Sequence, residues 1–154
     1  MAERPTGTVT FLFSDIEGST QRWERQREEM QRAFDRQETI MRQAIAVHGG
    51  YTYKMIGDAF QAAFATAPAA LSAALHAQRA LHAEAWGDVG PLRVRIALHT
   101  GVTHERGDDY VGPLLNRVAR LLSTAHGGQI LVSHATQVLV HDQLPSGASL
   151  RDLG

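Results

Sequence analysis

The feature that most restricts the fold is a pair of short strand-like runs, residues 51–55 (YTYKM) and 59–64 (AFQAAF), with only Ile56-Gly57-Asp58 between them. A connection this short that contains glycine and aspartate predicts a tight hairpin of two antiparallel strands. Segments with helical patterns lie on both sides of this hairpin. The chain is therefore expected to combine helices with one sheet.

The segments around the hairpin read as further strands and helices. A run rich in β-branched and aromatic residues (TVTFLF) is typical of a strand, and so is the alternation of apolar and polar residues in the segment LRVRIAL. Apolar residues at helical spacing predict a helix before and a helix after the hairpin. In chain order we expect a strand at 8–13, a helix from Ser19 or Thr20 to about His48, the hairpin, a helix from Pro68 to about Trp86, and a strand at 92–98. A kink in the first helix at Arg27 to Glu29 remains open.

This order, strand-helix-strand-strand-helix-strand, matches the ferredoxin-like βαββαβ arrangement, an α+β fold in which helices cover one face of an open sheet. An appended helix from Gly112-Pro113 to about Ala125 and an appended strand, GQILVS, are expected after this core. Residues 102–111 are expected to form a polar loop, 134–140 a short helix and 148–154 a strand-like end. Because one face of the sheet remains uncovered, we expect a second copy of the chain to cover it.

Composition excludes several classes of protein. With 154 residues the chain is expected to be one domain, 1–154, and its net charge of −1 provides no basic field for nucleic acid or an anionic membrane. The sequence has no cysteine and no apolar run near eighteen residues, which excludes a disulfide framework and a membrane span of that kind. The start, MAERPTG, lacks the apolar stretch of a signal peptide, so a cytoplasmic location is expected.

Two acidic residues at strand ends are candidates for a metal site. Asp15 follows the first strand, and Asp58 lies in the hairpin turn. A local interpretation remains open for both, because Ser14 to Glu17 fits a capping box and Gly57-Asp58 fits a plain turn. If the first strand lies beside the hairpin, the two carboxylates approach each other and would repel unless they were protonated or bridged by cations. Oxygen ligands suit Mg²⁺ or Mn²⁺.

Other candidates are weaker individually. The backbone amides of a helix start at Gly18, Ser19 and Thr20 favour phosphate. Asn116 and Arg120 lie about 40° apart on their expected helix, opposite its apolar arc, which an ordinary surface pair would also satisfy. Lys54 and Asp109 could equally be an exposed strand lysine and a solvated loop residue, and His99 and His104 are expected to be structural or solvated.

The ordered set of motifs FLFSDIEGST, YKMIGDAF, LRVRIALHTG, DDYVGPLLNRVARL and GGQILVS resembles the catalytic domain of class III nucleotidyl cyclases, the adenylate and guanylate cyclase family. Each motif is weak alone, but their order and spacing cover most of the chain. The resemblance implies a homodimer with two sites, each built from both chains. It assigns two Mg²⁺ or Mn²⁺ ions to Asp15, Asp58 and the Ile16 carbonyl, the purine to Lys54 and Asp109, the ribose to Asn116, and the phosphate charge of the reaction to Arg120.

The activity implied is the conversion of ATP to 3′,5′-cyclic AMP and pyrophosphate. Donor and acceptor counting does not exclude GTP, but the Lys54 and Asp109 pair resembles the adenylate-type members. Family domains usually continue past a point such as LRDLG into a strand pair that carries a lysine for the triphosphate, so a domain truncated at its C-terminus is expected here. The alternative is a catalytically weak or inactive module for nucleotide sensing or dimerisation that regulates an effector domain. Glu17 is left with a capping role.

Overall fold

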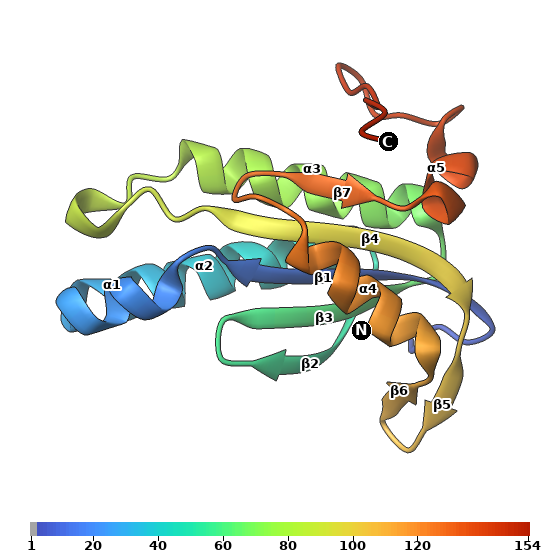
Figure 1. The fold of residues 1–154 in the computed structure, drawn as a ribbon, viewed down its shortest axis with the longest axis horizontal. Helices are drawn as coiled ribbons and strands as arrows, with labels where there is room; N and C mark the ends of the chain where they lie inside the picture. The colour runs from blue at the N-terminus through green and yellow to red at the C-terminus, as the bar shows by residue number, and fades with distance from the viewer. Residues whose placement is uncertain (1–2) are drawn as a thin grey trace.

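The computed structural model describes residues 3–154, and its sheet joins segments from both halves of the chain (Figure 1). The elements are β1 (Thr8–Ile16), α1 (Ser19–Arg25), α2 (Arg27–Val47), β2 (Tyr51–Ile56), β3 (Ala59–Phe64), α3 (Ala67–Ala83), a 3₁₀ turn η1 (Gly87–Val89), β4 (Val94–Val102), β5 (His104–Arg106), β6 (Asp109–Val111), α4 (Pro113–Ser123), β7 (Ile130–Val132) and α5 (His134–Val140).

The sheet has five strands in the order β2-β3-β1-β4-β7. The strand β1 lies between β3 and β4 and is antiparallel to both, whereas β7 is parallel to β4. The first four strands have the ferredoxin-like order, and α4 and β7 are appended to them. The fold predicted from the hairpin and its neighbours is therefore confirmed.

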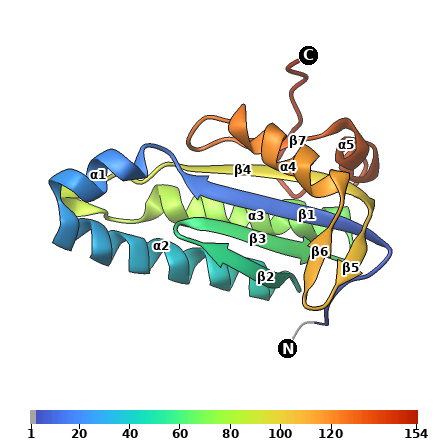
Figure 2. The same ribbon diagram turned by 60° about the horizontal axis from the view of Figure 1, so that its bottom comes forward.

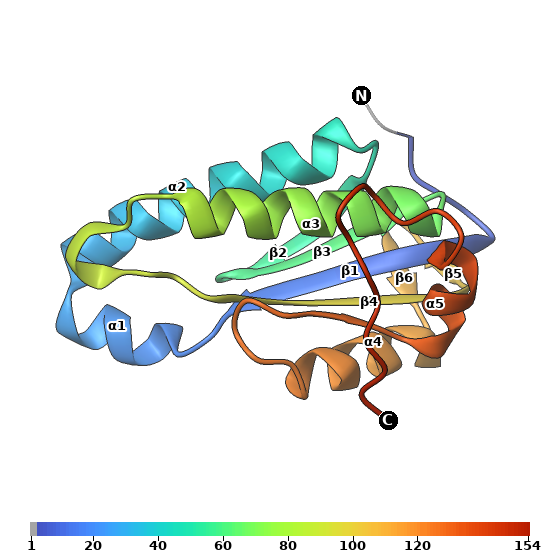
Figure 3. The same cartoon turned by 90° about the horizontal axis from the view of Figure 1, so that it is seen from above.

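The two faces of the sheet are covered by different helices (Figure 3). Even-numbered residues of β1, such as Leu12, point towards α2 and α3 and belong to the larger core. Odd-numbered residues, such as Phe11 and Phe13, pack in a second core with Val118 and Leu122 of α4. The expectation that helices cover only one face was wrong, because α4 turns its apolar arc onto the opposite face. We call that opposite side of the sheet the α4 face.

An irregularity in the hairpin places two consecutive side chains on the α4 face. The register of β2 against β3 shifts between Thr52 and Lys54, so Tyr53 is an extra residue, and Lys54 lies opposite Gln61. Gln61 in turn lies opposite Phe13. Because directly paired residues of antiparallel strands share a face, Lys54 projects on the same side as Phe13.

Three local expectations need correction. The segment 102–111 is not an irregular loop, because β5 and β6 pair as a small antiparallel sheet around a turn in which Gly107 has a φ of +62° (Figure 2). The residues 148–154 form no strand, since they pair with no neighbouring strand in the structure. The first long helix, for which a kink at Arg27 to Glu29 was left open, is divided at Gln26 into the separate helices α1 and α2. Among residues 3–154, no helix is both long and apolar enough to cross a membrane.

Candidate active site

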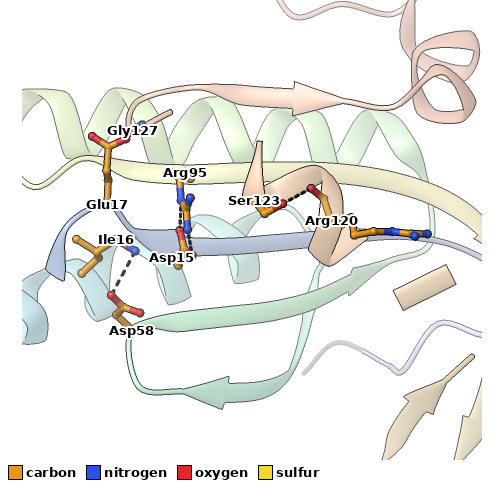
Figure 4. Close-up of polar contacts among 8 residues, drawn as sticks. All are labelled: Asp15, Ile16, Glu17, Asp58, Arg95, Arg120, Ser123 and Gly127. Carbon is orange, nitrogen blue, oxygen red and sulfur yellow. Dashed lines mark hydrogen bonds and ion pairs between the residues drawn. The ribbon is translucent and has the colours of Figure 1, made fainter. Parts of the chain in front are cut away.

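The carboxylates of Asp15 and Asp58 lie at the same edge of the sheet (Figure 4). The turn between β2 and β3 reaches the end of β1 because β3 pairs directly with β1. Asp58 Oδ2 accepts a hydrogen bond from the backbone N–H of Ile16 at 3.3 Å, which fixes this carboxylate beside the residue that follows Asp15. We call Asp15, Ile16 and Asp58 the carboxylate edge.

Arg95 of β4 is a further member of this region that sequence reasoning missed. It lies opposite Asp15 in the strand register, and its Nε and Nη2 donate to the two oxygens of Asp15 at 2.7 and 2.5 Å. The hydrogen bond to Asp15 is the main cause that raises the pKa of Arg95. The guanidinium offsets the repulsion between the two carboxylates. Only the β1–β4 register could have revealed this pair from the sequence.

The donor set of the carboxylate edge fits a hard divalent cation. Two carboxylates and one backbone carbonyl are oxygen ligands, and Mg²⁺ is typically held by one or two carboxylates together with substrate phosphates. Within residues 3–154, no group of three or more histidine, aspartate or glutamate side chains is placed to hold a metal. Any cation at this edge therefore needs ligands from solvent or substrate as well.

Glu17 does not cap a helix. Its Oε2 accepts a hydrogen bond from the backbone N–H of Gly127 at 2.7 Å, and its own N–H donates to the Arg93 carbonyl at 2.8 Å. The Ser14 hydroxyl is buried and has no hydrogen-bond partner among the described residues. The capping interpretation of Ser14 to Glu17 was therefore wrong, because the Glu17 side chain turns towards the loop after α4.

The turn at Gly18, with a φ of +69°, leads into α1 at Ser19 and Thr20.

Lys54 and Asp109 meet although they come from different sheets. Lys54 Nζ donates to Asp109 Oδ2 at 2.7 Å, and both side chains remain partly exposed. The bond from Lys54 is the main cause that lowers the pKa of Asp109, and the backbone N–H of Tyr110 donates to the other carboxylate oxygen at 2.8 Å. The pair presents one donor group and one acceptor group side by side.

An aromatic cluster fixes the position of Asp109. The rings of Phe11, Tyr53 and Tyr110 pack edge to face, with centroids 4.8 to 6.0 Å apart. The Tyr110 hydroxyl donates to the Pro5 carbonyl at 2.7 Å. Burial raises the pKa of Tyr110 to about 12 and also raises that of Tyr53, so both phenols stay neutral. The cluster anchors the β5–β6 sheet on the α4 face.

Asn116 and Arg120 lie on the exposed side of α4, opposite the buried Val118 and Leu122. This arrangement agrees with the helical spacing. In Figure 4 the Arg120 side chain points away from Asp15 and Asp58. A single chain therefore does not bring Arg120 to the carboxylate edge.

The two histidines considered in the sequence lie in different surroundings. His99 Nδ1 is 2.6 Å from the Ser133 hydroxyl, and burial, followed by the charge of Arg117, lowers its pKa. His104 is an exposed residue of β5. Neither histidine hydrogen-bonds a residue of the carboxylate edge among the described contacts.

With this geometry established, comparison with known proteins identifies the class. The model of the adenylate and guanylate cyclase catalytic domain matches residues 1–149. An uncharacterised protein of Mycobacterium tuberculosis is 44% identical over 152 residues, which cover 97% of this chain and 51% of that protein. The adenylate cyclase of Schizosaccharomyces pombe is 38% identical over 167 residues, which cover 92% of this chain and 10% of that enzyme.

Solved structures agree. An adenylate cyclase of Trypanosoma brucei, described in its monomeric state, superimposes with a TM-score of 0.81 at 27% identity and covers 94% of this chain and 77% of that one. The adenylyl cyclase CyaB of P. aeruginosa gives a TM-score of 0.78 at 25% identity, covering 89% and 82%. The chain thus belongs to the adenylate and guanylate cyclase catalytic domain family. It spans about half the length of the mycobacterial relative and a tenth of the length of the Schizosaccharomyces pombe enzyme.

Proposed function

We propose that this chain is an adenylate cyclase that converts ATP to 3′,5′-cyclic AMP and pyrophosphate in a homodimer with two shared sites. One observation carries the proposal. The chain has the carboxylate edge and also Asn116 and Arg120, but Arg120 points away from that edge. A second copy related by a two-fold axis supplies the missing half to each site.

In each site one chain contributes the carboxylate edge. Asp15, Asp58 and the Ile16 carbonyl hold two Mg²⁺ or Mn²⁺ ions, and the amides at Gly18, Ser19 and Thr20 face the phosphates. When bound, such a metal pair lowers the pKa of the ribose 3′-hydroxyl and stabilises the leaving pyrophosphate. Arg95 donates to both oxygens of Asp15, so a cation bound there would share these oxygens with the guanidinium or replace one of its two hydrogen bonds.

The other chain contributes the groups that orient the nucleoside. Lys54 donates to N1 of adenine and Asp109 accepts from its N6 amino group, a match to the one donor and one acceptor that the pair presents. The existing bond between the two side chains keeps them adjacent before ATP enters. Guanine could bind the same pair if Lys54 donated to its O6 and Asp109 accepted a hydrogen bond from its N1–H. The preference for ATP over GTP is therefore part of the proposal.

Asn116 and Arg120 complete the site and come from the same chain of the dimer as Lys54. Asn116 holds the ribose so that its 3′ oxygen lies in line with the α-phosphorus. That oxygen forms the new bond to phosphorus, its proton passes to solvent, and the bond to pyrophosphate breaks. Arg120 donates to the α-phosphate oxygens, and losing such a charge stabiliser in phosphoryl transfer typically costs on the order of 10³-fold in rate.

The test is complementation between two inactive variants, Asp15→Ala and Arg120→Ala. Each homodimer lacks one essential group in both sites, whereas a mixed dimer has one intact site. Random mixing makes half of the dimers mixed, so about one quarter of the wild-type rate of cyclic AMP formation is expected with ATP and Mn²⁺. Two folded, dimeric variants that stay inactive together would contradict shared sites, and an inactive wild-type dimer would contradict the activity itself.

A second function is favoured by one specific contact. Because Arg95 binds both oxygens of Asp15, the carboxylate edge is stable without a cation, as a nucleotide-sensing or dimerisation module would require. Calorimetry with a non-cyclisable ATP analogue separates the two. Binding of the analogue without any cyclic AMP production from ATP would favour the module.

A further inference from the structure

Glu17 is a polar side chain beside the carboxylate edge that the proposed reaction does not use. It connects two parts of the chain that are far apart in sequence, since its Oε2 accepts from the N–H of Gly127 at 2.7 Å. The Glu17 N–H donates to the Arg93 carbonyl at 2.8 Å, and the Gly128 N–H donates to the Val94 carbonyl at 2.9 Å. These bonds attach the end of β1 and the loop after α4 to the same start of β4. Figure 4 shows Glu17 and Gly127 next to each other.

The junction is tightly packed. A Cβ atom on Gly127 would lie 2.4 Å from the Arg93 Cβ and 3.3 Å from the Glu17 Cδ, so only glycine fits there without moving its neighbours. The hydrogen bond and the close approach at Gly127 therefore link the position of Glu17 to that of the loop.

The two ends of this junction belong to different active sites. Glu17 directly follows Ile16 of the carboxylate edge, and Gly127 comes four residues after Ser123, the last residue of α4. In the proposed homodimer, the carboxylate edge of a chain serves one site, whereas Asn116 and Arg120 of its α4 serve the other. Resting on that proposed function, we propose that Glu17 is a positioning residue that couples the two sites of the dimer through Gly127.

The hydrogen bond, rather than the charge, carries this coupling. Glutamine keeps an acceptor oxygen at the same reach, so Glu17→Gln preserves the bond to Gly127, whereas Glu17→Ala removes it. If Glu17 were instead a metal ligand, loss of the charge alone would weaken Mn²⁺ binding, and the glutamine variant would fail as the alanine variant does. The pair of variants thus distinguishes a positioning role from direct coordination.

The decisive experiment places Glu17→Ala in one chain of the mixed dimer, isolated with two affinity tags. The single intact site takes its carboxylate edge from the Arg120→Ala chain and its Arg120 from the Asp15→Ala chain. Adding Glu17→Ala to the Asp15→Ala chain alters only a carboxylate edge that is already inactive. Because one exposed hydrogen bond is removed, we expect kcat at the intact site to fall about fivefold, the rate equivalent of one ordinary hydrogen bond.

Three further arms complete the test. Glu17→Gln in the same chain should restore most of the parent rate, and Gly127→Ala in that chain should reproduce the loss, because its Cβ pushes the loop from Arg93. Glu28→Ala, which changes an exposed glutamate of α2, is the matched control and should leave kcat unchanged. All dimers are first compared by thermal unfolding, so that a loss of folded protein is separated from a loss of rate.

The outcomes are distinct. If Glu17→Ala in the Asp15→Ala chain leaves kcat at the parent value, the coupling is absent and the inference is overturned. If the glutamine variant is as slow as the alanine variant, the charge matters and positioning through Gly127 is wrong. If the parent mixed dimer itself forms no cyclic AMP, the proposed function fails, and the coupling fails with it.

Discussion

At the scale of single residues, the carboxylate edge depends on Arg95 as much as on its acids. The sequence predicted that Asp15 and Asp58 approach each other if the first strand lies beside the hairpin, as it does in a ferredoxin-like sheet, and β1 indeed pairs with β3. It did not predict Arg95 or the Gly127 partner of Glu17. Those contacts depend on strand register and on a loop 110 positions away, which no local pattern encodes.

We expect Arg95→Gln to lower stability without metal and to increase the stabilisation by Mn²⁺. The partly exposed pair with Asp15 is worth roughly 1 kcal/mol, which corresponds to about 2–4 °C in the midpoint of thermal unfolding for a domain of this size. Without the guanidinium a cation meets no competitor at Asp15, so added Mn²⁺ should raise the midpoint further than in the wild type.

Arg32→Gln, which changes an exposed arginine of α2, serves as the control for Arg95→Gln and should show neither effect. Both proteins are to be scanned in EDTA and at increasing Mn²⁺ concentration. If the Mn²⁺ response of Arg95→Gln is the same as that of the wild type, Arg95 and the cation do not compete for Asp15.

At the scale of elements, the long helices and the hairpin were predictable and the short β5–β6 sheet was not. Periodicity over many residues predicts the long elements, whereas three-residue strands such as β6 have too few positions to show alternation. The ring of Tyr110 in β6 packs on Phe11 of β1, a contact between residues 99 positions apart that no local pattern predicts. The apolar arc of α4 was also readable, but nothing local indicates which face of the sheet it covers.

We therefore expect Tyr110→Ala to be far more damaging than Tyr110→Phe. Tyr110 is fully buried, so its truncation should cost about 3–5 kcal/mol of unfolding free energy, as other large aromatic truncations do. The phenylalanine variant loses only the hydrogen bond to the Pro5 carbonyl, about 1 kcal/mol. Urea denaturation measures both. Equal losses in the two variants would mean that the hydroxyl, and not the ring, holds the β5–β6 sheet.

At the scale of the whole molecule, the family and the α+β architecture follow from the ordered motifs, and the single chain holds both halves of the proposed site at separate places. ATP bound with metal bridges two chains in such an arrangement, so ligand binding and dimerisation are linked. Asp15 and Lys54 both lie on the α4 face, and the proposed dimer assigns them to opposite sites.

We expect a non-cyclisable ATP analogue with Mn²⁺ to shift the monomer–dimer equilibrium towards the dimer. With each nucleotide contacting both chains, a saturating analogue at about 100 times its dissociation constant should stabilise the dimer by about 2.7 kcal/mol per site. Analytical ultracentrifugation measures the shift. Arg120→Ala should reduce this shift. If the analogue leaves the monomer–dimer equilibrium unchanged, the nucleotide does not bind between two chains.

The extra residue in β2 allows the side chains of both Tyr53 and Lys54 to lie on the α4 face. In a regular strand, neighbours alternate between the two sides of the sheet. In a hairpin without the irregularity, either the ring of Tyr53 or the ammonium group of Lys54 would lie on the α4 face, and never both. One inserted residue thus lets a single short strand anchor the sheet that carries Asp109 and also provide the cation that faces it.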